Sequence, residues 1–237
     1  MNIWYCIPSK RVADEAQNCI TAWRTCGYRT AVWRDAGDEH VDADLILSAE
    51  YGGYAQATNA LISEACERGA DICIIGGDDV YPDPSHDPQQ VGAEFVMHFN
   101  GTFGVMQPTG DRWGEDRSQP NFCGSAYVDR VCCSAWLGRE FCQTTYGGNG
   151  PLYHGYHHMF VDEELQEVAI KLGVLWQRRD LTQYHRHWGR TGRTMPGFLA
   201  VANSAHHWQR YANLFAMRKA AGFPGHEVAD VTVEFTA

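Results

Sequence analysis

Short apolar runs alternate with helical patterns through the first hundred residues, and this alternation constrains the fold more than any other feature of the sequence. The runs lie at residues 3–7, 29–33, 45–47 and 72–75. Segments with a helical apolar period separate the first run from the second and the third from the fourth. Such βαβ units predict an α/β fold with a mainly parallel sheet.

Each of the two helical segments carries one apolar face and ends before a glycine. Gly27 and Gly69 provide the stops, because glycine readily adopts the left-handed conformation that ends many helices. Both helices can therefore pack on the sheet. Their apolar faces consist of Val12, Ala16, Cys19, Ile20 and Trp23 in the first helix and of Ala57, Leu61, Ile62 and Ala65 in the second.

The order of elements changes after the fourth apolar run, and longer loops follow. Long loops in a compact domain are usually functional or mobile. The elements expected in this part are a loop at residues 81–88, a short helix, a strand near residues 102–106, a loop at residues 110–120, and helices at residues 135–143, 162–172 and 198–221.

The chain of 237 residues, 44% of them apolar, can bury a sizeable core. We expect a single domain over residues 1–237, with residues 194–237 as a C-terminal helical extension. No apolar run approaches the roughly 20 residues that span a bilayer, and the first residues do not resemble a signal peptide. We therefore expect a cytoplasmic protein with no membrane partner.

The cysteines argue against both a disulfide framework and a structural zinc site. Their number, nine, is odd, and Cys132 and Cys133 are adjacent. No CxxC pair occurs, although zinc sites commonly contain one. Reduced, mostly buried thiols are the better interpretation.

The formal net charge of −10 argues against a general nucleic-acid binder, because affinity for phosphate backbones comes from Lys and Arg. Residues 178–193 are an exception, with five Arg and two His against one Asp. This basic segment is either a solvated face or a phosphate-facing one. Its two closely spaced histidines favour the second interpretation.

The apolar run at residues 72–75 is followed by GGDD, which places two like charges side by side after a core strand. Ligands bind beyond the carboxyl ends of the strands in open α/β sheets, so Asp78 and Asp79 occupy a position where a site is expected. Ordinary exposed loop carboxylates are the alternative. A divalent cation between these carboxylates and their partners would relieve the repulsion.

Two familiar nucleotide motifs are absent: no GxGxxG follows the first apolar run, and no GxxxxGK[ST] occurs. Their absence argues against a dinucleotide-dependent dehydrogenase and a P-loop phosphotransferase. Polar residues such as Ser9 and Arg11 follow the first run instead, and Asp35 follows the second. A nucleotide whose phosphates are held by a metal fits this arrangement better.

In this arrangement the sequence resembles a glycosyltransferase of the GT-A type. The resemblance begins with the segments IPSKR, WRDAGD, YGGYAQATN and GGDDVYPDP, in that order. In that family the strand at the last segment ends in the DxD motif, which holds a divalent metal against the diphosphate of a nucleotide sugar. Gly77 stands here at the first Asp position, giving an xDD variant that is also found among family members. The chain is most similar to small glycosyltransferases encoded by phages.

The resemblance implies a Rossmann-like, mixed and mainly parallel sheet with helices on both faces, and it implies roles for particular residues. Asp79 would bind the metal, and Asp78 would contact the ribose or the metal. Asp35 would contact the base or its ribose. The expected donor-binding residues are Pro8, Ser9, Arg11, Asp35, Asp78 and Arg190.

Two motifs in the second half extend the resemblance. MFVDEEL resembles the xED segment that supplies the acceptor-side base, so Asp162 or Glu163 is the candidate, at a helix start whose dipole favours the ionised form. YHRHWGR resembles the closing HxH motif, which completes the metal site. Strand alternation would send His185 and His187 to one face, and His185 is favoured as ligand. Helix-capping acids and partly buried histidines are the alternatives.

Other segments offer further acceptor contacts. The glycine-rich residues 147–151 form either an acceptor-binding loop or a plain connector. His157 and His158 are adjacent, so at most one of them is expected to face the site. The aromatic residues that could stack on sugar or base faces, or lie in the core, are Trp113, Tyr153, Tyr156 and Trp188.

We therefore expect a metal-dependent, inverting glycosyltransferase that uses a nucleotide-diphosphate sugar, most simply a UDP-sugar, with Mn²⁺ or Mg²⁺. The first expected acceptor is a 5-hydroxymethylpyrimidine in phage DNA, which would place the protein in the host cytoplasm. A glycan, protein or small molecule is the alternative acceptor. Other functions to be weighed are a metal-dependent hydrolase or nuclease with the same Asp and His residues, and a carbohydrate-binding module without activity.

Overall fold

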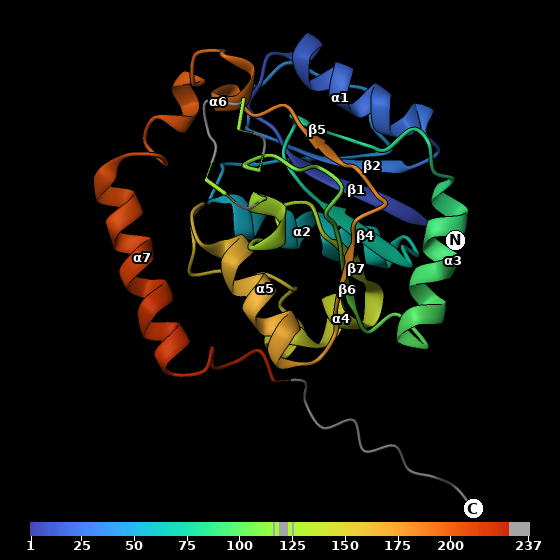
Figure 1. The fold of residues 1–237 in the computed structure, drawn as a ribbon. Coiled ribbons are helices and arrows are strands. Elements are labelled where there is room, and N and C mark those ends of the chain that lie inside the picture. The colour runs from blue at the N-terminus through green and yellow to red at the C-terminus, as the bar shows by residue number, and fades with distance from the viewer. Residues whose placement is uncertain (116, 119–122, 125, 228–237) are drawn as a thin grey trace, which may run out of the picture.

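The computed structural model describes residues 1–115, 117–118, 123–124 and 126–227, which form a sheet with helices on both faces (Figure 1). The seven-stranded sheet has the order β3-β2-β1-β4-β7-β6-β8. Neighbouring strands run parallel except at β7, which is antiparallel to both β4 and β6. The strands are β1 (Ile3–Pro8), β2 (Arg29–Arg34), β3 (Leu45–Ser48), β4 (Ile72–Ile75), β6 (Val105–Pro108), β7 (Trp136–Gly138) and β8 (Leu175–Arg178).

The first half of the sheet follows the βαβ order that the sequence predicts. β1 pairs in parallel with β2 and β4, and β2 pairs in parallel with β3. Helices α1 (Ala13–Thr25) and α2 (Tyr54–Glu67) connect these strands and pack on opposite faces of the sheet. The predicted mixed, mainly parallel α/β class is therefore confirmed, and the carboxyl ends of β1, β2 and β4 meet at one edge.

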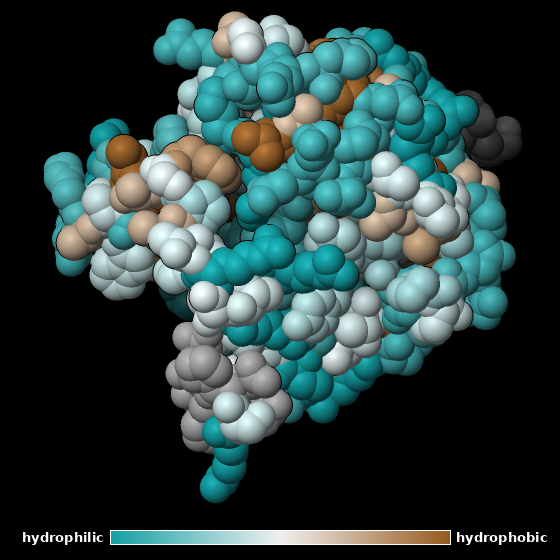
Figure 2. Space-filling view, turned by 90° about the horizontal axis from the view of Figure 1, so that it is seen from above, coloured by the Kyte–Doolittle hydropathy of each residue, from teal (hydrophilic) through white to brown (hydrophobic). Residues whose placement is uncertain are grey.

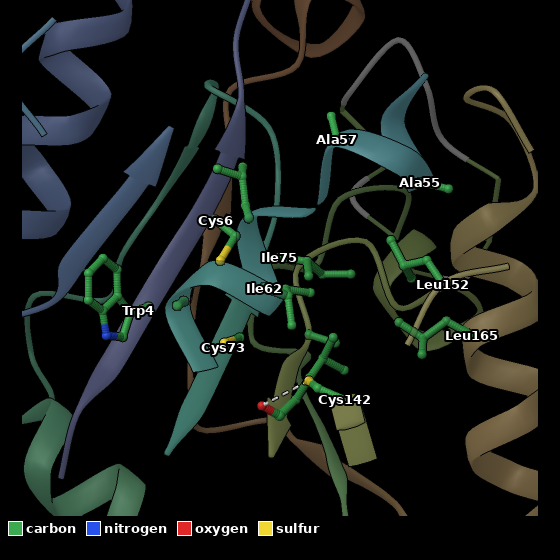
Figure 3. Close-up of a cluster of buried hydrophobic side chains, with 14 of the residues drawn as sticks. Trp4, Cys6, Ala55, Ala57, Ile62, Cys73, Ile75, Cys142, Leu152 and Leu165 are labelled. Atoms are coloured by element: carbon green, nitrogen blue, oxygen red, sulfur yellow. Dashed lines mark hydrogen bonds between the residues drawn. The ribbon is translucent and has the colours of Figure 1, made fainter. Parts of the chain in front are cut away.

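Two core layers separate the sheet from its helices. Trp4 and Tyr5, adjacent in β1, point into opposite layers because successive side chains of a strand alternate. Figure 3 shows the layer that contains Trp4, together with Ile75 and Leu165. Of the other helices, α3 (Pro88–Phe99) packs in the same layer as α1, and α4 (Arg139–Thr144) and α5 (Val161–Lys171) pack in the same layer as α2.

The segment predicted as a helix at residues 135–143 begins instead with a strand. β7 lies between β4 and β6, and α4 begins only at Arg139. Trp136 is buried, and its Nε1 donates a hydrogen bond to Gln183 Oε1 at 2.5 Å. Pairing with two strands and burial of this large side chain outweigh the local helical preference.

A second, two-stranded sheet joins segments that are far apart in the sequence. β5 (Val80–Tyr81) pairs antiparallel with β9 (Tyr184–His185), which places Val80 opposite His185. β6 begins later than the strand predicted near residues 102–106, and β8 was not expected. The short helices are α6 (Trp188–Thr191) and the 3-10 turns η1 (Tyr127–Asp129), η2 (Thr145–Gly148) and η3 (Gly197–Leu199).

The C-terminal helix α7 (Ala205–Ala220) is shorter than the helix predicted at residues 198–221. Ser204 caps its first turn with its side chain, which ends helical continuity with the preceding residues. Arg218 anchors the helix through an ion pair with the buried Glu164 of α5, at 2.6 Å. The expected extension therefore packs against the body of the domain, and residues 228–237 of it lie outside the described part.

The cysteines agree with the interpretation from composition. All nine are reduced thiols outside any disulfide, and most are buried. The helices of the described residues include none that is long and apolar enough to cross a membrane.

Candidate active site

A cavity of about 460 Å³ lies at the carboxyl ends of β1, β2 and β4. Loops after these strands form one wall, which we call the donor side after the role expected from the sequence and define as residues 8–11, 33–35 and 77–79. Residues 157–163 and 198–203 form another wall, which we call the acceptor side for the same reason. The predicted site residues that line the cavity are Pro8, Ser9, Arg11, Asp35, Asp78, Asp79, Asp162, Glu163, His185 and His187.

The two adjacent carboxylates after β4 are held by an arginine from the loop after β1. Arg11 Nε contacts Asp78 Oδ1 at 2.6 Å, and Arg11 Nη2 contacts Asp79 Oδ2 at 3.4 Å. Ser9 Oγ donates to Asp78 Oδ2 at 2.6 Å. The guanidinium therefore relieves the repulsion between the like charges in this structure.

The two carboxylates differ in protonation behaviour. Burial raises the pKa of Asp78 despite the charge of Arg11. Burial also acts to raise the pKa of Asp79, but the hydrogen bond with His185 and the nearby charges outweigh it, so the pKa lies below its usual value. Asp79 is thus the better charged ligand of the pair.

His185 reaches Asp79 because of the small sheet. The β5–β9 pairing, extended by a hydrogen bond from the Arg186 N–H to the Asp79 carbonyl at 2.7 Å, places the two side chains together. His185 Nε2 lies 3.2 Å from Asp79 Oδ1. A residue late in the chain thereby joins the carboxylates that follow β4.

His187 reaches the same cavity by a different local structure. It lies outside β9 and caps α6, where its Nδ1 accepts a hydrogen bond from the Gly189 N–H at 3.1 Å. Strand alternation therefore does not explain why both histidines line the cavity. Burial, with the charge of His185, lowers the pKa of His187 to about 4, so its imidazole is neutral at pH 7.

Arg190, predicted as a donor-binding residue, is absent from the described lining of the cavity. Its Nη1 lies 2.6 Å from Oδ2 of the buried Asp111. The same Oδ2 accepts the His185 backbone N–H at 3.0 Å, and Arg190 stacks on Tyr184 at 4.1 Å. Asp111 and Arg190 together form a clamp that fixes the backbone of β9.

The clamp is completed by an aromatic side chain from the loop predicted at residues 110–120, part of which lies outside the described residues. The Trp113 ring lies 5.5 Å from that of His185 and 4.9 Å from that of His187. Trp113 therefore supports the histidines from behind and does not line the cavity. From the sequence, the position of Asp111 in a polar loop after a strand is the feature that could have indicated its role in the clamp.

The residues present offer only part of a divalent-cation site. Within the described part of the chain, no group of three or more His, Cys, Asp or Glu side chains is arranged to hold a metal ion. Asp79 and His185 supply one oxygen and one nitrogen donor, which suit Mn²⁺ chemically. The other ligands of such an ion would have to come from a bound phosphate and water.

The acidic residues at the start of α5 line the acceptor side, and their environment differs from the sequence expectation. Burial raises the pKa of Asp162 well above its usual value, with a contribution from Glu163, and burial also raises the pKa of Glu163. Desolvation thus outweighs the helix dipole, which was expected to favour the ionised forms. Asp162 Oδ1 is buried with no hydrogen-bond partner among the described residues.

The backbone before these acids is constrained. Phe160, the N-cap of α5, has a φ of 68°, a left-handed conformation that is costly for a residue with a side chain. Its ring packs against Trp208 of α7, with centroids 5.4 Å apart. This arrangement couples the start of α5 to the C-terminal helix.

Several lining residues were not predicted from the sequence. Lys10 forms salt bridges of 2.8 Å to both Asp35 and Asp38, so the predicted ribose contact Asp35 is already paired. His157 and His158 both line the cavity, contrary to the expectation that adjacent residues could not. The other unpredicted lining residues include Trp33, Tyr51, Tyr54, Met159 and Phe160 and the apolar side chains of Phe198, Leu199 and Val201.

The glycine-rich residues 147–151 lie away from this cavity. Gly148 and Gly150 line a separate groove of about 500 Å³ beside α2 and α4. Tyr156, which follows them, donates a hydrogen bond to the buried Glu164 at 2.8 Å. The segment is a connector near the α5–α7 anchor, and it does not form an acceptor loop at the cavity.

No family model and no curated protein matches the sequence. Solved structures do match. The mannosyltransferase PcManGT from Pyrobaculum calidifontis, in complex with GDP-Man and Mn²⁺, has a TM-score of 0.52 at 14% identity, covering 94% of this chain and 73% of that one. Glucosyl-3-phosphoglycerate synthase from Mycobacterium tuberculosis, in complex with Mn²⁺, UDP-Glc and phosphoglyceric acid, has a TM-score of 0.50 at 14% identity, covering 94% and 80%.

S. aureus TarS is similar as well, with a TM-score of 0.51 at 10% identity over 92% of this chain. The match covers 43% of the TarS chain, so this protein spans less than half of its length. At these identities the likeness shows the fold alone. The chain has the GT-A, Rossmann-like fold of nucleotide-sugar glycosyltransferases.

Proposed function

We propose that this protein is a glycosyltransferase that moves a sugar from a nucleotide-diphosphate sugar to an acceptor hydroxyl. The observation that carries the proposal is the convergence of Asp79, His185 and the α5 carboxylates on one cavity. These residues come from three distant parts of the sequence. The GT-A fold of the chain supports the same conclusion.

The donor side would bind the nucleotide diphosphate. Arg11 would exchange part of its contact with Asp78 and Asp79 for the diphosphate, since a guanidinium pairs well with phosphate oxygens. Asp35 would accept a hydrogen bond from the ribose or base, while Pro8 and Ser9 line the wall beside it. A UDP-sugar is our first choice of donor.

Asp79 and His185 would hold a divalent cation, Mn²⁺ or Mg²⁺, with His187 beside them. When bound, such a cation supplies positive charge that stabilises the leaving diphosphate. Asp79 is suited to this task because its pKa is lowered and it remains ionised. Mn²⁺ fits the mixed oxygen and nitrogen donors better than Mg²⁺.

Glu163 would act as the base that takes the proton of the acceptor hydroxyl. The acceptor oxygen then forms a bond to the anomeric carbon while the bond from that carbon to the diphosphate oxygen breaks, which inverts the configuration. We assign the role to Glu163 because Asp162 Oδ1 is inaccessible and its carboxyl has the more strongly raised pKa. A raised pKa in Glu163 strengthens it as a base near neutral pH.

A thermal-shift screen tests the proposal directly. UDP or GDP with Mn²⁺ should raise the Tm of the protein, because a ligand that binds only the native state stabilises it. Mass spectrometry should then detect loss of sugar from the matching donor. Metal-dependent cleavage of nucleic acid without any nucleotide-sugar binding would overturn the proposal in favour of a hydrolase.

A further inference from the structure

We infer that the acceptor carries its hydroxyl on a neutral group with an apolar face, and that it is not a phosphate-bearing polymer such as DNA. This inference rests on the proposed function and names the substrate class of the same cavity. Three observations carry it: the apolar character of the acceptor side, the distribution of cations, and the state of the basic segment at residues 178–193.

The acceptor side is largely apolar. Phe160 and Met159 line it beneath the start of α5, and Phe198, Leu199 and Val201 line it from the segment before α7. Figure 2 shows hydrophobic side chains on the lobe that contains α7 and this segment. The donor side, by contrast, carries Arg11, Lys10 and the carboxylates.

Some of these apolar side chains remain accessible at the rim. Phe198 is 42% exposed and Val201 is 65% exposed. Apolar side chains that gather beside a polar cleft usually mark a ligand-binding surface. Because they continue the wall that holds Glu163, the occupant that fits them is the group bearing the acceptor hydroxyl.

The cationic side chains that line the cavity lie on the donor side. Lys10 and Arg11 are the Lys and Arg side chains in its described lining, and both are paired with carboxylates. The acceptor side has Asp162 and Glu163 instead. A phosphate there would face two acidic side chains, and the described lining of that side offers neither Lys nor Arg to pair with it.

The histidines of the acceptor side do not replace those cations. Burial lowers the pKa of His157, with contributions from the nearby His207 and Arg210, and burial lowers the pKa of His158, with a contribution from His157. Both imidazoles are therefore mainly neutral at pH 7. They can donate or accept a hydrogen bond to a hydroxyl without attracting a phosphate.

Two arginines of the basic segment, which suggested a DNA acceptor, form ion pairs within the protein, whereas Arg179, Arg186 and Arg193 are exposed. Arg178 pairs with Glu94 and Asp180, and Arg190 pairs with Asp111. Arg186 stacks on the Tyr81 ring at 4.0 Å. Within the described lining of the cavity, none of the arginines of this segment occurs.

The test compares two acceptor types with the donor found in the thermal-shift screen. One acceptor is a p-nitrophenyl glycoside, which is neutral and has an aryl face. The other is a DNA duplex that contains 5-hydroxymethylcytosine. We expect sugar transfer to the glycoside and none to the DNA, and faster transfer to the DNA would overturn the inference.

Variants locate the binding surface. Phe198→Ser and Val201→Asp should each raise the KM for the glycoside about tenfold, since loss of apolar contact in a pocket costs roughly that factor. The KM for the donor should change less than about twofold. Met97→Asp, at a side chain that is 77% exposed on α3, is the matched control and should change neither.

The outcomes separate the inference from the proposed function. Slow hydrolysis of the donor by water, measured without any acceptor, reports the proposed function alone. Donor hydrolysis without transfer to neutral aryl acceptors would overturn only the inference, as would a rise in donor KM with unchanged acceptor KM in the two variants. Absence of any donor binding or hydrolysis would overturn both.

Discussion

The two sides of the cavity differ in how completely their titratable groups are paired. On the donor side, Asp35, Asp78 and Asp79 each lie within a salt bridge. On the acceptor side, Asp162 Oδ1 and His157 Nδ1 are buried with no partner among the described residues. The protein's own contacts therefore fix the carboxylates of the donor side, while the acceptor side retains titratable groups whose unpaired burial costs stability.

The largest effect is expected when the charge of Asp79 on the donor side is removed. Asp79→Asn should reduce transfer by at least about 10³-fold, since charge stabilisation of the leaving group is a large part of such catalysis. The variant should still fold, with a modest loss of Tm at pH 7, because the lowered pKa of Asp79 means that its charge stabilises the native state there. Steady-state assays with the best donor and Mn²⁺ measure the effect, and unaltered turnover would contradict the assignment.

Substitution of the base on the acceptor side should lower the rate of transfer without weakening donor binding. Glu163→Gln should lower kcat by about 10²-fold, within the range of general-base catalysis, while donor affinity persists. Asp162→Asn should cost far less, because its buried carboxyl is not the base. Full activity in both variants, with normal donor binding, would show that neither residue acts as base.

The clamp behind the donor side can be loosened without touching the cavity. Asp111→Asn should weaken the affinity for Mn²⁺ about tenfold, as is typical for loss of a group that orients a metal ligand. The cause is loss of the charged contact with Arg190 and a weaker hold on the His185 backbone. Calorimetric titration of Mn²⁺ measures this, and Asp42→Asn, at an exposed salt bridge with Arg24, is the matched control.

A loss of Mn²⁺ affinity equal in the Asp111 and Asp42 variants would exclude a positioning role for Asp111. A loss of Mn²⁺ affinity restricted to Asp111→Asn, with activity restored by excess Mn²⁺, would support that role. Arg190→Lys should retain part of the affinity, since it keeps the charge of the clamp but not the stacking on Tyr184.

The pH dependence should distinguish the two sides. Because burial raises the pKa of Glu163, the base is protonated below that pKa and ionised above it, so the rate should increase as pH rises through a value above 4.5. We therefore expect the rate to fall as the pH is lowered from 7 into the acid range. Rate profiles across this range should lose that limb in Glu163→Gln.

The smallest expected effect concerns stability. A carboxyl whose pKa is raised by folding binds its proton more strongly in the native state, so stability is lost as pH rises through that pKa. Glu163→Gln should therefore raise the Tm at pH 7 slightly, because the variant no longer buries a carboxylate there. The gain should vanish in acid, and a lower Tm at pH 7 would contradict the raised pKa.

Elements with a strong local pattern were predicted well. The strands and helices up to residue 75 follow from apolar periodicity and glycine stops, since each helix and strand there buries one continuous apolar set. The helix at residues 162–172 corresponds to α5 within one residue at each end. β7 was missed because its extended form depends on two neighbouring strands that no local pattern shows.

The residues of the candidate site were predicted better than their arrangement in space. Asp78, Asp79 and the acids at 162–163 could be found because they follow a strand or open a helix. Arg190 could not be placed, since its short-range neighbours did not reveal the buried Asp111 that pairs with it. The apolar wall of Phe198 and Val201 was hidden inside a predicted helix.

The sequence by itself determined the order of βαβ units, the carboxylates after β4 and the acids that begin α5, because each depends on residues close in the chain. Only the tertiary structure decided that β9 pairs with β5 and brings His185 to Asp79. It also decided that Arg178 pairs with Glu94 and Arg190 with Asp111, and that the described lining of the acceptor side contains neither Lys nor Arg. These contacts join distant segments, and their energies depend on burial and geometry that no local pattern contains.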